Sequence, residues 1–260
     1  MLRWVHSSRY DGFKSQVKVM GFPYEVHSTG SSEYIKNAHY GFITSTHYLG
    51  AAILGHLVSC KCEILHNAKE KSLLIPDSVK WYKISDYFMA DEPPRRMFVS
   101  EFDLNHAYWS VAYRLGFIGQ KTYDKFLRFK TKHFRLIALG MLAKREYVAK
   151  FDEKGNRVGS VDVKVNEIGV QIFRRIAWEV AEEMQRLSEA RPDAFRFYWF
   201  DNIIFDRFTR HLETDYAYKQ KDETLQLLFV PKRKVILKLG EREFMFPSVQ
   251  METMTNVVPF

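Results

Sequence analysis

The sequence predicts an α+β protein, in which hairpins and helices are mixed without a regular strand–helix–strand repeat. Two stretches, 145–165 and 195–208, read as pairs of strands around tight turns. Two others, 120–146 and 166–190, have the length and apolar spacing of helices. We therefore expect an antiparallel sheet with helices packed against it.

The composition is that of a globular chain with ample material for a core. Of its 260 residues, 46% are hydrophobic, and they include 21 Phe and 14 Tyr. No apolar run is long enough for a membrane span, and the opening MLRWVHSSRYDGF lacks the apolar stretch of a secretory signal. Cys60 and Cys62 are too close together for an ordinary disulfide bridge, which indicates a reducing compartment. We expect a cytoplasmic protein, in the host cytoplasm if it is viral.

The chain is basic, with a formal net charge of +8 and a pI near 9.3. This charge favours a polyanionic partner, most simply nucleic acid or nucleotide phosphates. The alternative is a basic protein with no such partner.

Composition also indicates a boundary. Residues 1–95 are rich in Ser, Gly, His and Tyr and have few long periodic runs, and the stretch MADEPPRR at 89–96 contains two prolines. We therefore expect an N-terminal region of unknown role over 1–95 and a second domain over 96–260.

Two acids lie where a predicted strand meets a predicted helix. In MFVSEFDL (97–104), Glu101 and Asp103 point to the same face at the end of the strand. Paired carboxylates suit Mg²⁺, which prefers a few hard oxygen ligands and keeps water or phosphate for the others. Asn105 is placed to cap the following helix, 106–117. The alternative is a solvated polar face on an edge strand.

A third acid, Asp201, lies in a predicted hairpin. FRFYWF and IIFDRF flank Asp201-Asn202, which reads as a two-residue turn. Because the flanking strands are apolar, the turn is expected to aim Asp201 into a cleft; an ordinary surface turn is the alternative.

The predicted helix over 120–146 carries a row of cations. They follow one another at steps of 4, 3, 4 and 3, which places them on one helical stripe: Lys121, Lys125, Arg128, Lys132 and Arg135. Aligned cations repel one another unless anions meet them, so the stripe indicates either a phosphate-binding surface or a solvated face.

The stretch HLVSCKCEILH contains four side chains that could bind a soft metal. If it is helical, His56 and Cys60 share one face while Cys62 and His66 share another. Two faces do not close readily on one tetrahedral zinc ion, so buried thiols are favoured over a zinc site.

Three of these motifs together resemble family B DNA polymerases. Asp103-Leu-Asn-His-Ala-Tyr108-Trp resembles motif A, Lys132 and Gly140 have the spacing of motif B, and the Asp201 hairpin resembles motif C. The resemblance covers roughly 97–240 and implies a palm-like sheet with a short basic fingers-type helix over 120–146. No proofreading domain is expected.

The resemblance also implies residue roles. Asp103 and Asp201 would hold Mg²⁺ or Mn²⁺ with support from Glu101, Tyr108 would lie beneath the incoming sugar, and Lys132, with Arg128 and Arg135, would hold the triphosphate. The implied activity is template-dependent nucleotidyl transfer, with primed or single-stranded DNA and nucleoside triphosphates as partners. A compact chain of this kind is typical of a phage or mobile element.

Two departures from the family pattern favour a different function. Asn202 stands where motif C has its second acid, and Leu136 and Leu139 replace the Asn and Tyr of motif B. They favour a catalytically inactive palm-like protein that binds nucleic acid or a replication partner. A basic interaction protein with no site is a third reading.

Overall fold

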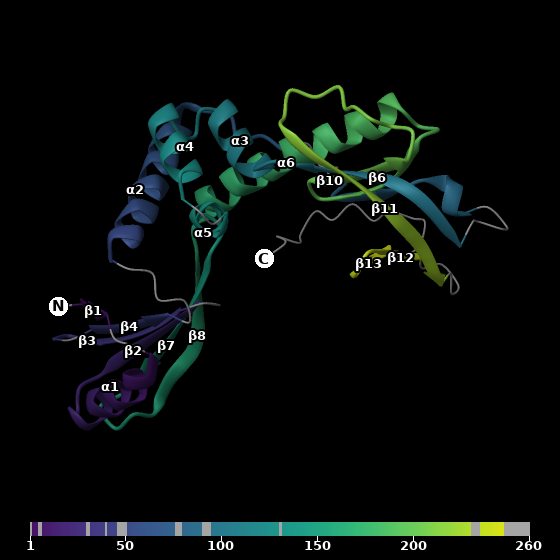
Figure 1. The fold of residues 1–260 in the computed structure, drawn as a ribbon. Coiled ribbons are helices and arrows are strands. Elements are labelled where there is room, and N and C mark those ends of the chain that lie inside the picture. Colours follow the sequence, from purple (N-terminus) through teal and green to yellow (C-terminus); the bar gives the residue numbers. More distant parts are fainter. Residues whose placement is uncertain are drawn as a thin grey trace. The chain divides into compact units, whose positions relative to one another are not determined.

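The computed structural model describes residues 2–4, 7–29, 32–39, 41–45, 51–75, 80–89, 95–129, 132–229 and 235–246 (Figure 1). Within these ranges the chain is α+β, with largely antiparallel sheets and packed helices, as predicted. It forms two compact units, each built from two stretches of chain. The first unit is Met1–His66 with His133–Phe173, and the second unit is Asn67–Lys132 with Arg174–Phe260.

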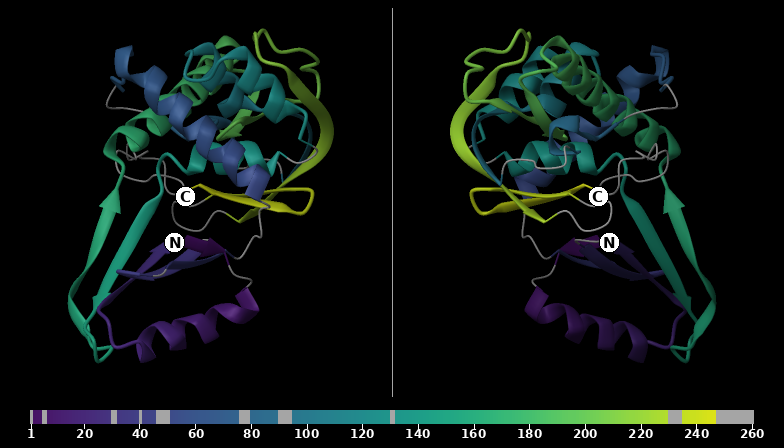
Figure 2. Two further views of the ribbon diagram at one scale, coloured as in Figure 1. Left: turned by 90° about the vertical axis from the view of Figure 1, so that its left-hand side faces the viewer. Right: turned by 90° about the vertical axis from the view of Figure 1, so that its right-hand side faces the viewer.

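The first unit is a six-stranded sheet with helices, in the strand order β1-β4-β3-β2-β7-β8. Its pairings are antiparallel except for the parallel β1–β4 pair. Figure 2 shows α1 along one face of this sheet. Its elements are β1 (Leu2–Trp4), α1 (Ser7–Val19), β2 (Tyr24–Thr29), β3 (Ser32–Asn37), β4 (Gly41–Ser45), α2 (Ala51–Asn67), α5 (His133–Gly140), β7 (Arg145–Phe151) and β8 (Arg157–Val165).

A small core lies between α1 and the sheet. Val17 of α1 is buried with Tyr24, Val26 and Ile35, and the ring of Phe151 stacks on that of Tyr24 with centroids 4.8 Å apart. Alternation along β2 therefore directs Tyr24 and Val26 into this core and the intervening polar residues to the other face.

The predicted boundary at residue 95 does not separate the two units. β2 pairs with β7 in a register that sets His27 opposite Val148, so residues 133–173 belong with the N-terminal strands. Residues 67–95 belong instead to the second unit. Pairing between strands far apart in the chain leaves no signal in local composition, which is why the boundary was misplaced.

The second unit is a seven-stranded antiparallel sheet in the order β13-β12-β11-β6-β10-β9-β5. It also contains most of α6. Its elements are η1 (Ala68–Glu70), β5 (Tyr82–Ile84), η2 (Asp86–Met89), β6 (Arg96–Leu104), α3 (Ala107–Arg114), α4 (Gln120–Leu127), α6 (Glu167–Ala190), β9 (Phe195–Trp199), β10 (Asn202–Asp206), β11 (Tyr218–Phe229), β12 (Val235–Leu239) and β13 (Arg242–Phe246).

This sheet curls so that the β12–β13 hairpin covers one of its faces. Phe244 of β13 contacts Phe197 of β9 with ring centroids 5.1 Å apart, and Phe246 contacts Trp199 at 5.4 Å, although other strands lie between β13 and β9. Figure 1 shows α6 on the opposite face, where Lys83 of β5 donates to Ser188 of α6 at 3.3 Å. The central strands are thus enclosed on both sides.

Several predicted elements are confirmed. They are the β7–β8 hairpin around the turn at 152–156, the short helix α3, the long helix α6 that ends before Arg191-Pro192, and the strands β6, β9 and β10. Within the described residues, no helix is both long and apolar enough to cross a membrane.

The single helix predicted over 120–146 is wrong. The structure has two helices, α4 and α5, followed by β7 from Arg145. On one continuous helix Phe126 and Arg135 would lie on opposite sides, since nine residues at about 100° each amount to half a turn beyond two turns. Both are buried, so the break allows each short helix to bury its own face.

Candidate active site

The structure brings Asp103 and Asp201 to one end of adjacent strands. Asp103 in β6 lies opposite Asn202, the first residue of β10. Asp201 immediately precedes β10, and the backbone N–H of Leu104 donates to its carbonyl oxygen at 3.0 Å. β6 is a central strand rather than a solvated edge strand, so that alternative for Glu101 and Asp103 is wrong.

The turn that carries Asp201 differs from the predicted one by one residue. Trp199 pairs with Asn202, so the turn residues are Phe200 and Asp201 instead of Asp201 and Asn202. Phe200 has a φ of 56°, a left-handed conformation that is unfavourable for a bulky side chain. Its backbone N–H donates to the carbonyl oxygen of Trp81 at 2.9 Å, which helps to hold the turn. Backbone strain next to a half-buried acid is typical of functional sites.

The pKa values of both aspartates are raised. Burial raises the pKa of Asp201 to about 6, and the negative charge of Asp103 adds to this effect. Burial also raises the pKa of Asp103, although the positive charge of Lys132 acts in the opposite direction. Among the described residues neither carboxylate forms an ion pair. The pair therefore has a deficit of positive charge, which a bound cation would relieve.

Glu101 has a different environment, although it shares the face of Asp103. Both of its oxygens are held by Arg242, from Nη1 at 2.8 Å and from Nη2 at 2.5 Å, and Asn202 Nδ2 also donates to it. Burial acts to raise the pKa of Glu101, but these hydrogen bonds outweigh burial and keep the pKa below its usual value. Glu101 therefore anchors the β12–β13 hairpin, and its oxygens are already occupied.

Tyr108 lies in α3, which follows β6. Burial raises the pKa of its hydroxyl group, and the charge of Asp201 adds to this effect, which places the phenol near the aspartates. The prediction that Asn105 caps α3 is wrong. His106, with a φ of 54°, takes the N-cap position, and the backbone N–H of Asn105 donates to the carbonyl oxygen of Ala217 at 2.8 Å.

The predicted cationic stripe is not present as one surface. Lys121, Lys125 and Arg128 are exposed on or just after α4, and Lys132 is exposed in the turn before α5. Arg135 is buried in α5, which belongs to the first unit. Of this set, Lys132 is the cation whose charge acts on both Asp103 and Asp201.

Two other cations near the aspartates were missed in the sequence. In the register of β6 with β11, Lys219 lies opposite Asp103 and Lys221 lies opposite Glu101. Both line a hollow of about 690 Å³ together with Asp103 and Arg242. The Lys-Gln-Lys alternation at 219–221 does indicate two lysines on one face of a strand, but nothing local reveals which strand lies beside it.

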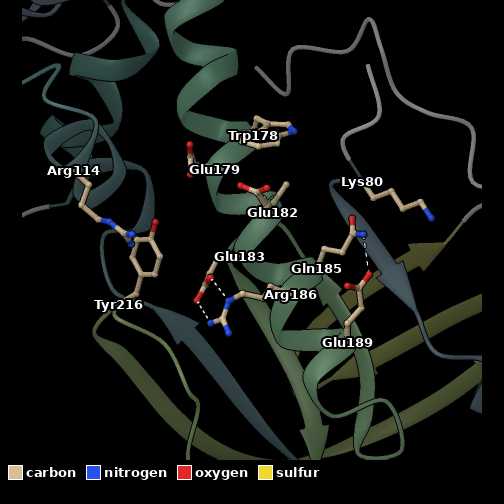
Figure 3. Close-up of a pocket in the computed structure, with 11 residues that line it drawn as sticks. Lys80, Arg114, Trp178, Glu179, Glu182, Glu183, Gln185, Arg186, Glu189 and Tyr216 are labelled. Atoms are coloured by element: carbon tan, nitrogen blue, oxygen red, sulfur yellow. Dashed lines mark hydrogen bonds and ion pairs between the residues drawn. The ribbon is translucent and has the colours of Figure 1, made fainter. Parts of the chain in front are cut away.

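A second hollow, of about 590 Å³, lies along α6 (Figure 3). Several of its charged side chains already have partners: Arg186 donates to Glu183 at 2.7 Å, and the guanidinium of Arg114 lies 4.7 Å from the ring centroid of Tyr216. The hydroxyl of Thr214 donates to Glu183 at 2.5 Å. This hollow is separate from the aspartate pair.

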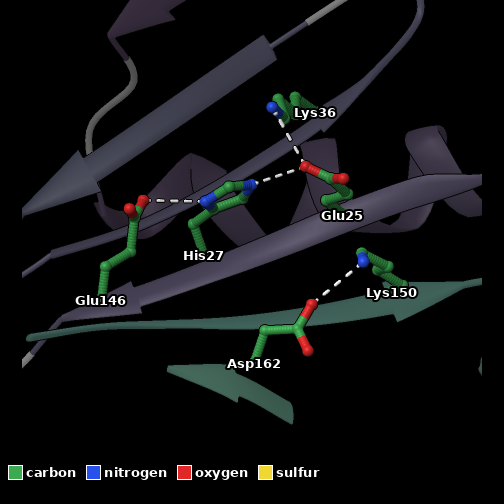
Figure 4. A network of polar contacts seen from close by, with 6 residues as sticks. All are labelled: Glu25, His27, Lys36, Glu146, Lys150 and Asp162. Atoms are coloured by element: carbon green, nitrogen blue, oxygen red, sulfur yellow. Dashed lines mark hydrogen bonds and ion pairs between the residues drawn. The ribbon is translucent and has the colours of Figure 1, made fainter. Parts of the chain in front are cut away.

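The first unit contains a polar network that the sequence did not reveal (Figure 4). The imidazole of His27 is buried, with Nδ1 2.8 Å from Glu146 Oε1 and Nε2 2.8 Å from Glu25 Oε2. The ring of Tyr34 stacks on it with centroids 4.0 Å apart, and Lys36 contacts Glu25 at 3.0 Å. Hydrogen bonds from His27 and then from Lys36 lower the pKa of Glu25.

The stretch that contains His56, Cys60, Cys62 and His66 is helical and lies in α2. In α2, Cys60 is buried and its pKa is raised to about 12 by burial, whereas Cys62 is exposed. The expectation of buried thiols is thus confirmed for Cys60 and wrong for Cys62. Within the described ranges, no group of three or more His, Cys, Asp or Glu side chains is arranged to hold a metal ion.

Comparison with known proteins gives no relative for this chain. No family model matches the sequence, and neither the curated proteins nor the solved structures contain a significant match to it.

Proposed function

We propose that the second unit is a palm-like nucleotidyl transferase, in which Asp103 and Asp201 form the catalytic centre for template-dependent extension of a nucleic acid. The observation that carries this proposal is the meeting of two half-buried aspartates, from distant parts of the chain, at one end of β6 and β10. Burial raises the pKa values of both, and such shifts are typical of groups that act on a ligand.

The pair fits a divalent cation such as Mg²⁺ or Mn²⁺. Asp103 and Asp201 offer hard carboxylate oxygens, and Mg²⁺ is commonly held by one or two carboxylates with water and substrate phosphates as the other ligands. A bound cation would supply activation of the attacking hydroxyl and neutralisation of phosphate charge. Glu101 is not needed as a ligand, because Arg242 and Asn202 occupy its oxygens.

The side chains around the pair suit a triphosphate. Lys132 acts on both aspartates, and Lys219 and Lys221 line the adjoining hollow. Cations at this position would attract the phosphates, and the net charge of +8 would favour approach of a nucleic acid. The charge of Asp201 acts on the hydroxyl group of Tyr108, and by the resemblance to motif A this side chain would contact the sugar of a bound nucleotide.

A second candidate function follows from Glu101, whose two oxygens already accept hydrogen bonds from Arg242 and Asn202. The described residues offer two carboxylates at this site rather than three, and Asn202 donates a hydrogen bond where a further acid could stand. A palm-like protein that binds nucleic acid without extending it needs the cations of the site but not its aspartates. Primer extension separates these two functions.

The experiment mixes the full chain with a primed DNA template, nucleoside triphosphates and either Mg²⁺ or Mn²⁺. Extension is expected, and Asp103→Asn or Asp201→Asn should each lower its rate by about 10³-fold or more while DNA binding persists. Asp193→Asn, in an exposed turn of the same unit, is the matched control and should retain the rate.

The outcomes distinguish the two functions from one another. Binding of primed DNA without extension under either metal would favour the non-catalytic protein. Extension that survives both Asn substitutions would contradict the proposed site. Absence of binding to both primed and single-stranded DNA would contradict both functions.

Binding itself tests the cations. Lys219 is exposed opposite Asp103, and Lys221 is exposed opposite Glu101, where it also contacts Glu223. Replacing both lysines by Met should weaken binding of DNA and reduce its dependence on salt concentration. The double variant Lys18→Met/Lys154→Met, at two exposed lysines of the first unit, is the matched control, and fluorescence anisotropy across a range of salt concentrations is the measurement. Equal salt dependence in the Lys219/Lys221 variant and the control would remove these lysines from the proposed site.

A further inference from the structure

The outer strand of the first unit's sheet exposes three valines along one face. Within the described residues β8 is the last strand of the sheet, and every one of its residues is exposed. Val161, Val163 and Val165 are 39%, 54% and 41% exposed and lie on one face. Edge strands are usually protected by charges, prolines or irregular backbone, because an open apolar edge pairs with other strands.

The sequence of this edge is complementary to itself. If β8 runs antiparallel to β8 of a second copy with the twofold axis at Val163, Val161 lies opposite Val165 of the second copy. Asp162 then lies opposite Lys164 of the second copy, and symmetry repeats both pairs. We infer that this chain forms a dimer through β8 in this register, joining two six-stranded sheets into one.

Both faces of the joined sheet favour this register. On one face, the valines continue the side of the sheet that holds Val26, and Tyr147, itself 44% exposed, lies opposite Val163. On the other face lie Asp162 and Lys164, where Asp162 already contacts Lys150 at 2.9 Å (Figure 4). Opposite charges across a strand pair are favourable, whereas like charges in the same positions are unfavourable.

The backbone limits how far the pairing extends. Gly159 has a φ of 73°, and the register of β8 with β7 shifts between Val148 and Lys150, so the regular part of β8 begins near Ser160. A pairing centred on Val163 uses only this regular part. Because the same edge is used by both copies, the contact is closed after two chains and does not propagate into a fibre.

A cysteine at the axis gives the sharpest test. In the dimer, Val163→Cys places two thiols opposite each other, so mild oxidation should convert most of the chain into a disulfide-linked dimer. Val158→Cys is the matched control, because Val158 is 53% exposed on the same strand but would lie about 30 Å from its counterpart in the second copy. Oxidation of the unsubstituted chain serves as a second control, because it measures any cross-linking through the exposed Cys62. Equal cross-linking of the Val158 and Val163 variants would overturn the inference.

Charge exchange tests the register independently of cross-linking. Asp162→Lys or Lys164→Asp alone places like charges opposite each other and should raise the dimer dissociation constant by about tenfold or more in analytical ultracentrifugation. The double variant Asp162→Lys/Lys164→Asp restores opposite charges and should restore the dimer, with circular dichroism confirming that all variants are folded. A chain that is monomeric at all concentrations, a larger assembly, or a double variant as weak as the single variants would overturn the inference. Neither test depends on the proposed activity.

Discussion

Both compact units hold partly buried carboxylates on a sheet face, but they compensate the charge differently. In the first unit, Glu25 and Glu146 contact the two ring nitrogens of His27, and the pKa of Glu25 is lowered by its hydrogen bonds to His27 and Lys36. In the second unit, burial raises the pKa values of Asp103 and Asp201, and the charge of Asp103 raises that of Asp201 further. Carboxylates whose charge is balanced by hydrogen-bond donors and cations are typical of a structural role. A carboxylate pair without such partners indicates a site where a cation binds.

Glu101 shows that the contrast also holds within a single strand. It lies two residues from Asp103 on the same face, yet Arg242 and Asn202 compensate it fully and its pKa is lowered. The difference between Glu101 and Asp103 thus arises from which side chains reach each acid. The following changes test the contrast between compensated and uncompensated acids.

The largest effect on stability is expected from Arg242→Met. It would leave Glu101, which is 5% exposed, buried with only Asn202 as a partner, so the free energy of unfolding should fall by about 2–3 kcal/mol. Urea denaturation at pH 7 measures this loss. Lys219→Met, an exposed lysine on the neighbouring strand, should change the stability by about 0.5 kcal/mol or less. Equal losses in the two variants would show that Glu101 is not anchored as described.

Asp201→Asn should raise the free energy of unfolding, whereas Arg242→Met lowers it. The pKa of Asp201 is about 6 in the folded protein and near 3.8 when unfolded, so the protonated form stabilises the fold and this contribution is lost as the pH rises through 6. Removing the charge should therefore stabilise the protein at pH 7 in the absence of divalent cations, by on the order of 1–3 kcal/mol. Below about pH 4 the gain should vanish. Thermal unfolding from pH 4 to 8 measures the trend, and destabilisation at pH 7 would contradict it.

A smaller effect is expected in the first unit from Glu25→Gln. The pKa of Glu25 is lowered in the folded state, so its carboxylate stabilises the fold at neutral pH, and this stabilisation is lost as the pH falls through the folded pKa. Its side chain is 33% exposed, which limits the expected loss at pH 7 to about 0.5–1 kcal/mol. The same thermal series should show the difference shrinking towards low pH. A gain in stability at pH 7 would mean that Glu25 is not compensated.

Local signals in the sequence predicted much of the second unit. The hairpin around Asp201, the strand that ends after Asp103 and the helix from 107 all follow from patterns within a few residues. The proximity of the two aspartates followed from resemblance to a polymerase palm. The break between α4 and α5 could not be predicted, because it depends on burying Phe126 and Arg135 on different sides.

Long-range pairing accounts for the other differences. β2 joins β7, and Lys219 lies opposite Asp103, only because of registers between strands far apart in the chain. Arg242 reaches Glu101 because the sheet curls until the β12–β13 hairpin covers its face. None of these contacts has a local sequence signature, so the lowered pKa of Glu101 and the network of His27 emerged only from the structure.

Binding of Mn²⁺ would show whether Asp103 and Asp201 form an uncompensated pair that holds a divalent cation. This is the claim on which the proposed function depends. Electron paramagnetic resonance of free Mn²⁺, titrated with the full chain at pH 7, should show binding that is lost in Asp103→Asn and in Asp201→Asn. Glu101→Gln should retain binding, because Arg242 and Asn202 occupy the oxygens of Glu101. Binding that persists in both aspartate variants, or no binding by the unsubstituted chain at millimolar Mn²⁺, would contradict the claim.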